Sequence, residues 1–241
     1  MNTRLACHLA ALACVLVTPS LQAANLSIPE AKADEAARSV AAMLVAGRGV
    51  VASHQKLIND PDKGDKGFTP DYVAEQMSEA FAKSTGTRPE GITDPDVKAA
   101  VMATLDASKK AIANNQSRIN QPGKAFKGFI PAVYGRVTGN ILKGESGVEI
   151  KQTTFEPRNS YNTPDAYELG ILKRFAETKP SVGTGEKVGT SYRYLQPIYI
   201  QEACLQCHGD PKGEKDIAGK TKEGYKLGDL RGAISVTLPV R

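Results

Sequence analysis

Apolar residues recur at helical spacing through the first half of the chain. Positions four and three residues apart form one stripe: Ala33, Ala37, Val40, Leu44, Gly47, Val51, His54 and Ile58. This period predicts one long amphipathic helix. Ser27, followed three residues later by Glu30, has the pattern of a capping box at the start of that helix.

Three further helices are predicted before residue 147, each beginning at a proline. Thr69 precedes Pro70 and Asp94 precedes Pro95, which is the favoured order of an N-cap and a first helical residue. Pro131 begins the last of them, which we expect to end near Gly144. The first two have apolar stripes: Val73, Met77 and Phe81, then Val97, Val101, Leu105 and Ile112.

Two loops of this helical region are similar in sequence. Residues 58–70 and residues 119–131 align without gaps and are identical at eight of 13 positions. Each segment joins a long predicted helix to one that begins at proline. The similarity predicts two helix–loop–helix connections packed side by side.

The period changes after Gly147. Alternating apolar and polar residues predict strands over 148–155, 190–200 and 232–240, with Pro197 indicating an edge position or a bulge. A helix is predicted from Thr163 to about Thr178. Residues 183–189 are typical of a glycine-rich turn, and residues 210–228 of a polar, lysine-rich loop. Helices followed by a small antiparallel sheet predict an α+β fold.

Residues 1–23 have the features of a secretory signal. Arg4 precedes an apolar run from Leu9 to Val17 that is too short to span a bilayer, and Ala23 is the small residue expected at a cleavage site. We find no later segment long and apolar enough to cross a membrane. We therefore expect export to the periplasm without membrane insertion, and one domain over 24–241 with a helical extension over about 24–145.

Removal of this signal would simplify the chemistry of the chain. Cys204 and Cys207 would be the remaining cysteines, and His54 and His208 the remaining histidines. The net charge would fall from +5 to +4, because Arg4 is the only charged residue of the segment. The basic residues are dispersed and aromatic residues are few, so we expect no nucleic-acid binding. A mildly basic surface can help to dock an acidic redox partner.

The most specific motif is Cys204-Leu205-Gln206-Cys207-His208. C-x-x-C-H is the attachment signature of c-type haem, in which two thiols bind the vinyl groups and the histidine is the proximal iron ligand. The motif predicts one covalent haem c. A zinc site that adds His54 is an alternative, but adjacent Cys207 and His208 suit a tetrahedron poorly. A dithiol redox pair is another alternative, but the sequence around the motif lacks the βαβ pattern that surrounds such pairs.

The sixth iron position has several candidate ligands. His54 is the other histidine beyond the signal and lies in an apolar stripe, where a histidine is more often a core residue. Met77 is the alternative, although core filling is the commoner role of a methionine. Met43 and Met102 are weaker candidates, and an open site with water is a further option.

Basic and aromatic residues near the predicted strands are candidates for contact with the haem. Arg158 and Arg231 are candidates for binding its propionates, because a guanidinium matches a carboxylate in bidentate geometry. The alternative for each is an ordinary surface arginine without a haem contact. Tyr192, Tyr194 and Tyr199 precede the motif at strand spacing and either pack on the porphyrin or belong to the strand itself.

Five segments of the second half carry a family resemblance: residues 126–132, 151–153, 158–168, 204–211 and 228–236. They resemble the periplasmic PAS-like c-type haem domains found in bacterial sensors and in stand-alone exported proteins. The resemblance implies a PAS-like antiparallel sheet with long N-terminal helices, one covalent haem, and a redox-sensing or gas-sensing role. Fused sensors also carry a transmembrane segment and an output module, so sensing here would require a partner protein.

The leading hypothesis is an exported monohaem sensor of redox state or of a diatomic gas. The alternative is a periplasmic electron-transfer cytochrome c, with the lysines of residues 210–228 forming the docking face. We expect no enzymatic activity, since the sequence shows no Arg/His pair of the kind used by haem peroxidases.

Overall fold

The computed structural model describes residues 25–241, and the predicted secretory signal therefore lies outside the described residues. The main helices are α1 (Ala33–Ser53), α3 (Pro70–Thr85), α4 (Pro95–Ala113), α6 (Pro131–Ser146) and α7 (Ala166–Thr178). Short helices are α2 (Gln55–Ile58), α5 (Gln116–Ile119) and α8 (Glu202–His208). The strands are β1 (Glu149–Thr153), β2 (Thr184–Val188), β3 (Ser191–Tyr199) and β4 (Leu230–Pro239).

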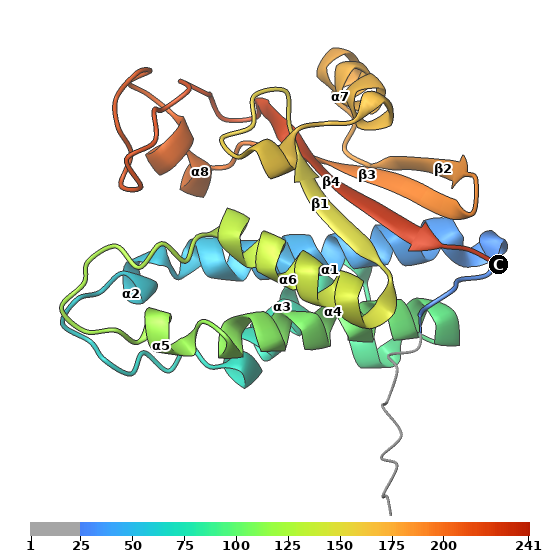
Figure 1. Ribbon diagram of the computed structural model, residues 1–241, viewed down its shortest axis with the longest axis horizontal. Coiled ribbons are helices and arrows are strands. Elements are labelled where there is room, and N and C mark those ends of the chain that lie inside the picture. Colours follow the sequence, from blue (N-terminus) through green and yellow to red (C-terminus); the bar gives the residue numbers. More distant parts are fainter. Residues whose placement is uncertain (1–24) are drawn as a thin grey trace, which may run out of the picture.

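The four strands form one antiparallel sheet in the order β1-β4-β3-β2. Helix α7 covers one face, and α1 and α6 cover the other (Figure 1). Side chains alternate between these faces, as the pleat requires. Leu195 and Ala233 pack beneath α7, while Tyr194 and Ile234 join the core on the side of α1. This arrangement confirms the α+β prediction.

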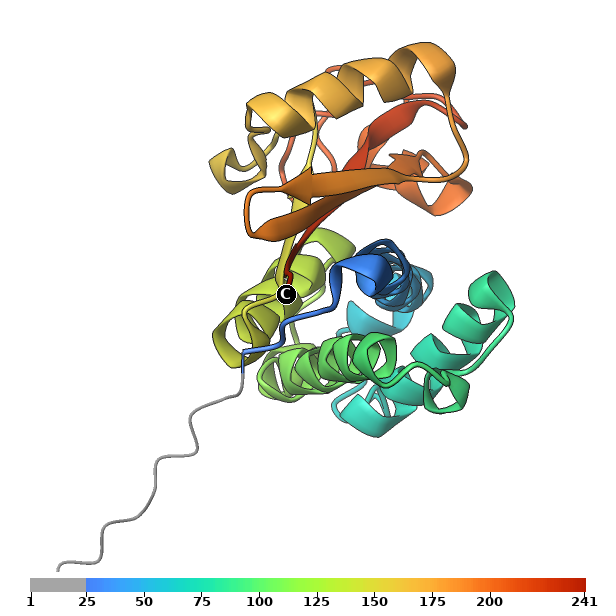
Figure 2. The same ribbon diagram turned by 90° about the vertical axis from the view of Figure 1, so that its right-hand side faces the viewer.

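Helices α3 and α4 form a further layer beyond α1 and α6 (Figure 2). Helix α1 thus has the sheet on one side and helices on the other, and 11 of its residues are buried. Residues 30–53 are long and apolar enough, by length and composition, to cross a membrane. The expectation that no such segment exists was wrong, because a helix packed on several sides is apolar around most of its surface.

The predicted N-caps of two helices are confirmed. The side chain of Thr69 accepts a hydrogen bond from the backbone N–H of Tyr72, and that of Asp94 accepts from Asp96 and Val97. The capping box expected at Ser27 and Glu30 is wrong, because the helical region begins with a 3-10 turn at Glu30–Lys32 that has no side-chain cap. A capping box does form at Asp165 and Glu168, at the start of α7.

The two similar loops lie side by side and exchange equivalent hydrogen bonds. The side-chain oxygen of Asn59 accepts from the backbone N–H of Lys127 at 2.9 Å, and that of Asn120 accepts from the backbone N–H of Lys66 at 3.4 Å. Each of these buried lysines also directs its ammonium group to the carbonyl three residues earlier. The repeated sequence therefore encodes a repeated, reciprocal packing of two helix–loop–helix units.

Two segments differ from the sequence prediction, and one irregularity agrees with it. The predicted single helix over residues 33–58 breaks at His54, which separates α1 from α2. The predicted turn at 183–189 contains β2, an edge strand that pairs with Ser191–Leu195. Pro197 lies beyond that pairing, so its missing N–H faces an unpaired side, and a bulge follows at Ile198/Tyr199.

Gly47 provides a test of the contact between α1 and α6. A Cβ atom built there would lie 2.6 Å from the Cζ atom of Tyr134. Tyr134 is fully buried and donates a hydrogen bond to Ser108, so it has little freedom to move. We expect Gly47→Ala to lower the free energy of unfolding by about 1–3 kcal/mol through overpacking, measured by thermal and denaturant unfolding.

Gly144→Ala is the matched control. Gly144 is exposed in α6, and a Cβ atom there would meet nothing within 4 Å. This substitution should stabilise the protein by about 0.5–1 kcal/mol through helix propensity. Equal stability of the two variants would contradict the close approach of Gly47 and Tyr134.

Candidate functional site

The C-x-x-C-H motif forms the short helix α8 directly after β3. Backbone hydrogen bonds from Ile200 to the carbonyl of Asp229, and from Gly228 to the carbonyl of Ile200, hold the start of this segment against the chain entering β4. Cys204 and Cys207 are three residues apart and therefore lie on one face of the helix. Both thiols are free and half-buried, and burial raises the pKa of Cys207.

His208, the last residue of α8, is held by one nitrogen of its ring. Nδ1 lies 2.9 Å from Oε2 of Glu223, while Nε2 has no hydrogen-bond partner among residues 25–241. Burial lowers the pKa of His208 below its usual value, although the hydrogen bond to Glu223 acts in the opposite direction. Because a carboxylate accepts, the proton lies on Nδ1 and the lone pair of Nε2 is left unshared, the arrangement typical of a metal-binding histidine.

Arg158 holds Glu223 in place. Its Nε donates to Oε1 of Glu223 at 2.6 Å and its Nη2 donates to Oε2 at 2.7 Å. Nη1 donates to Asp216 at 2.6 Å, and Nη2 also donates to the carbonyl oxygens of Cys207 and Thr221, both at 2.9 Å. All the nitrogens of this guanidinium are therefore engaged within the protein. Arg158 therefore orients the histidine network, and its contact with a propionate stays a prediction.

Two carboxylates of the long loop are kept ionised by this network. Burial opposes ionisation of Glu223, but hydrogen bonds from Arg158 and His208 outweigh it and hold the pKa of Glu223 below its usual value. Asp216 is similar: burial opposes ionisation, while the backbone N–H of Lys220 and the guanidinium of Arg158 lower its pKa. The loop also pairs Lys222 with Glu214 and Lys226 with Asp210. Two of the five lysines of this loop are thus paired with carboxylates.

A groove of about 2500 Å³ runs along α1, and Cys204, Cys207 and His208 belong to its lining. Helix α8 contacts α1 across it and lies near the C-terminal end of α1 (Figure 1). The lining includes the apolar side chains of Val182 and Ile217, which are 51% and 52% exposed. Exposed apolar residues around a concave surface are typical of a ligand site.

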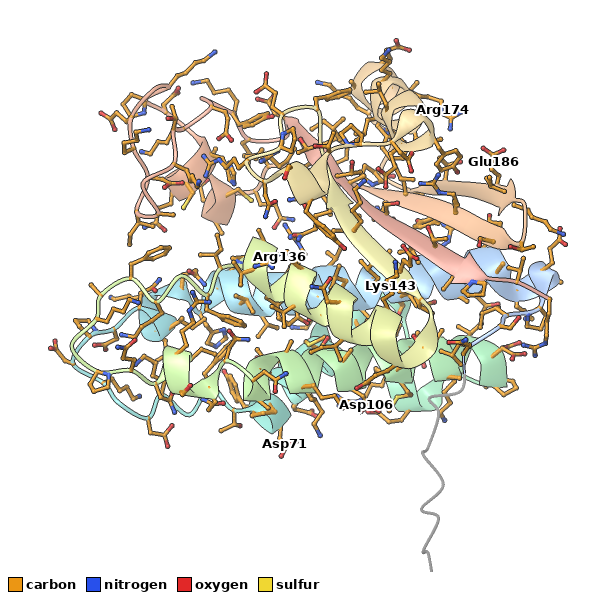
Figure 3. The ribbon with its side chains drawn as sticks, viewed as in Figure 1. Asp71, Asp106, Arg136, Lys143, Arg174 and Glu186 are labelled. Carbon is orange, nitrogen blue, oxygen red and sulfur yellow. The ribbon has the colours of Figure 1, made fainter. Side chains whose placement is uncertain are left out.

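Arginines complete the lining of this groove. Arg231, the second residue of β4, lines the groove; it donates to Oγ1 of Thr154 at 2.8 Å and lies 3.8 Å from Oε1 of Glu223. Arg48 of α1 also lines the groove. Arg136 lies on the N-terminal half of α6, beside it (Figure 3).

The predicted sixth ligands have other partners. His54 borders the groove, but its Nε2 lies 2.9 Å from the hydroxyl of Tyr72 on α3, and its Nδ1 lies 2.8 Å from the carbonyl of Val50. Its ring also packs against Phe68. Met77 is fully buried among the helices, where its Sδ lies 3.4 Å from the hydroxyl of Tyr134. The structure brings neither residue to the motif.

The zinc alternative is not assembled in the part of the chain that the structure describes. No group of three or more His, Cys, Asp or Glu side chains there is placed to hold a metal ion. His54, the fourth ligand in that alternative, is directed to Tyr72. The hydroxyl groups of the β3 tyrosines have partners within the protein: Tyr192 bonds to Asp34, Tyr194 to Gln196 and Tyr199 to the carbonyl of Pro180, while Tyr199 also lines the groove.

Sequence reasoning missed Glu223, Asp216 and Arg48. Glu223 lies 15 residues after His208 in an irregular loop, and no period or motif marks it. Arg48 is one charged residue in an otherwise apolar stretch from Val40 to Val51, and that isolation was a usable signal. A charged side chain in a helix that is buried on most sides requires a partner or a function.

A family model describes most of this arrangement. The model of Tll0287-like proteins matches residues 92–239, which is more than half of the chain. The protein belongs to the Tll0287-like family. This membership confirms the family resemblance inferred from the sequence. The match includes α4, the sheet and the C-x-x-C-H motif, while α1 and α3 precede it.

The comparison with solved structures gives a distant relative. The crystal structure of the cyanobacterial heme-protein Tll0287 aligns with 61% of this chain and 97% of its own, at 21% sequence identity and a TM-score of 0.43. No curated protein matches the chain.

Arg158→Ala tests the ion network around His208. The substitution leaves Asp216 and Glu223 without their main counter-charge, and the side chains involved are 1–22% exposed. Breaking a buried ion pair on one side costs about 3–5 kcal/mol, so we expect a loss of that size at pH 7 in chemical unfolding. The control is Arg88→Ala, whose exposed pair with Glu75 should be worth less than about 1 kcal/mol.

The difference in the free energy of unfolding between Arg158→Ala and wild type should become smaller at acidic pH. The pKa of Asp216 is lowered from 3.8 in the folded state, so its contribution to stability is present above 3.8 and is lost as the pH falls through the folded value. A pH-independent loss in Arg158→Ala would show that the arginine acts through packing alone.

Proposed function

We propose that this protein binds one haem covalently through Cys204 and Cys207 and uses it to sense redox state or a diatomic gas. The proposal rests on the arrangement of the thiols and the imidazole at α8. Two free thiols lie three residues apart on its surface, and the next residue, His208, has a free Nε2 while Glu223 holds its Nδ1. All three side chains line one groove.

The groove suits the chemistry of a haem. A porphyrin is a large apolar surface with two carboxylates at one edge, and the lining combines apolar residues such as Val182, Ile198 and Ile217 with arginines. The thiols would form the thioether bonds, and Nε2 of His208 would hold the iron. When bound, the haem supplies a one-electron redox couple and a site for small ligands.

The surrounding residues prepare His208 for this role. Glu223 accepts the Nδ1 proton, which fixes the tautomer and raises the basicity of Nε2. Arg158 holds that carboxylate and also the carbonyl of Cys207, so the imidazole and the motif backbone are positioned by one side chain. A loop of irregular structure is thereby made rigid where it meets the site.

Sensing is favoured over electron transfer by the positions of His54 and Met77. A permanent electron carrier needs two strong protein ligands, whereas the described residues of the groove contain one other imidazole, His54, and no methionine. His54 would have to give up its contact with Tyr72 to reach an iron. The sixth position is therefore left to water or to an exchangeable ligand.

The proposal extends to the compartment and to the mode of action. Covalent haem attachment in bacteria takes place outside the cytoplasmic membrane, which agrees with the secretory signal inferred for residues 1–23. The protein would act in the periplasm, without enzymatic activity, and would pass its signal to a partner protein. Family membership and the haem carried by the cyanobacterial relative support the haem itself.

Covalent attachment is tested by the mass of the exported protein. We expect the wild type to carry one haem that survives acid denaturation, and the double variant Cys204→Ala, Cys207→Ala to carry none. His208→Ala is the matched control, because it keeps both thiols and should retain the mass of the haem while its absorption spectrum changes. Covalent haem in the double variant would refute the attachment site.

The sixth position is tested with CO. The absorption spectrum of the dithionite-reduced wild type should shift on addition of CO, because no protein ligand from the groove holds the iron strongly. His54→Ala should respond in the same way as the wild type. A sharp low-spin spectrum that ignores CO, and that changes in His54→Ala, would establish His54 as a ligand and favour electron transfer.

A further inference from the structure

Arg48 differs from the other partly buried arginines of the described chain. Arg158, Arg193 and Arg231 are also half-buried, and each has a carboxylate within 4 Å. Arg48 has no such partner among residues 25–241. Its one hydrogen bond is weak, from Nη1 to the carbonyl of Pro131 at 3.4 Å.

The surroundings of Arg48 increase the need for an anion. It lines the same groove as Arg231 and the motif, and the positive charge of Arg231 opposes its own. Burial lowers the pKa of Arg48 to about 10, so the guanidinium remains charged at neutral pH. A partly buried cation next to a second cation is costly unless an anion neutralises it.

The position of the pair indicates which anion is suitable. Arg48 approaches from α1, while Arg231 approaches from the start of β4. The lining of the groove also includes Cys204 and Cys207 and apolar residues such as Ala46, Val50 and Ile198. A small inorganic anion would leave that apolar lining uncovered. A planar apolar ligand with carboxylates at one edge would cover the lining and neutralise both arginines.

We propose that Arg48, together with Arg231, binds the carboxylates of the haem. This proposal rests on the proposed function. It assigns to Arg48 the role that the sequence suggested for Arg158, whose donors are occupied by Glu223 and Asp216. Guanidinium groups suit this role because they form charge-assisted, bidentate hydrogen bonds with carboxylates.

The assignment connects the haem to the helical layer. Arg48 is part of α1, which packs against the sheet and against α3, α4 and α6. A displacement of the haem edge would therefore act directly on the central helix of the protein. This connection belongs to the part of the chain that precedes the family match at residue 92.

The experiment uses the haem-loaded protein and three substitutions on α1. Arg48→Ala removes the group, Arg48→Gln keeps polarity without charge, and Arg38→Ala is the control. Arg38 lies on the same helix and has its own exposed partner, Asp34. Haem content is measured by intact mass, the propionate bending bands by resonance Raman spectroscopy, the reduction potential by titration, and CO binding by absorption.

All three variants should retain covalent haem, because the thioether bonds require the cysteines alone. Both Arg48 variants should shift the propionate bands and lower the reduction potential, since loss of a nearby positive charge favours the ferric state. Arg38→Ala should match the wild type in both measurements. If Arg48→Ala does not fold, the comparison rests on Arg48→Gln.

Two results would overturn the proposal. One is an unchanged propionate spectrum and potential in the Arg48 variants. The other is an unchanged propionate spectrum with altered CO affinity, which would assign Arg48 to the ligand on the iron. Absence of covalent haem from the wild type is a different failure: it refutes the proposed function first, and this proposal with it.

Discussion

The site depends on the hydrogen bonds of one guanidinium. Arg158 follows β1, yet its donors reach Glu223, Asp216 and the carbonyls of Cys207 and Thr221. It thereby joins the end of the first strand, the motif helix and both halves of the long loop. The loop has little regular structure of its own, so its shape is set by this ion network and by the backbone bonds from Gly224 and Tyr225 to the carbonyl of His208. Without the arginine, two buried carboxylates would repel each other where the chain must close around the histidine.

Helix α1 provides the opposite wall and shows how packing and site chemistry are related. Because α1 lies between the sheet and the other helices, it is apolar on most sides and makes close contacts, such as that of Gly47 with Tyr134. Within that apolar surface, Arg48 is the partly buried charge without a carboxylate partner among the described residues. An unusual residue in a well-packed helix thus indicates a ligand contact more clearly than the many exposed charges elsewhere.

The repeated loops explain why the helical layer has its particular shape. Asn59 and Asn120 occupy equivalent positions and each binds the backbone of the other unit. These reciprocal bonds join the α1–α3 unit to the α4–α6 unit. The sheet packs against the helical layer that the two units form. The second unit ends directly in β1, so the helical layer and the sheet share one continuous core.

Local sequence determined the features that depend on neighbouring residues. The helices beginning at Pro70, Pro95 and Pro131, the alternation of β4 and the α8 motif follow from caps, periods and spacing. Tertiary structure decided what depends on distant residues. His54 satisfies the same apolar period whether it faces a haem or Tyr72, and Arg158 is equally suited to a propionate or to Glu223. The choice depends on which partner the fold brings within 3 Å, and residues 65 positions apart carry no local signal of that contact.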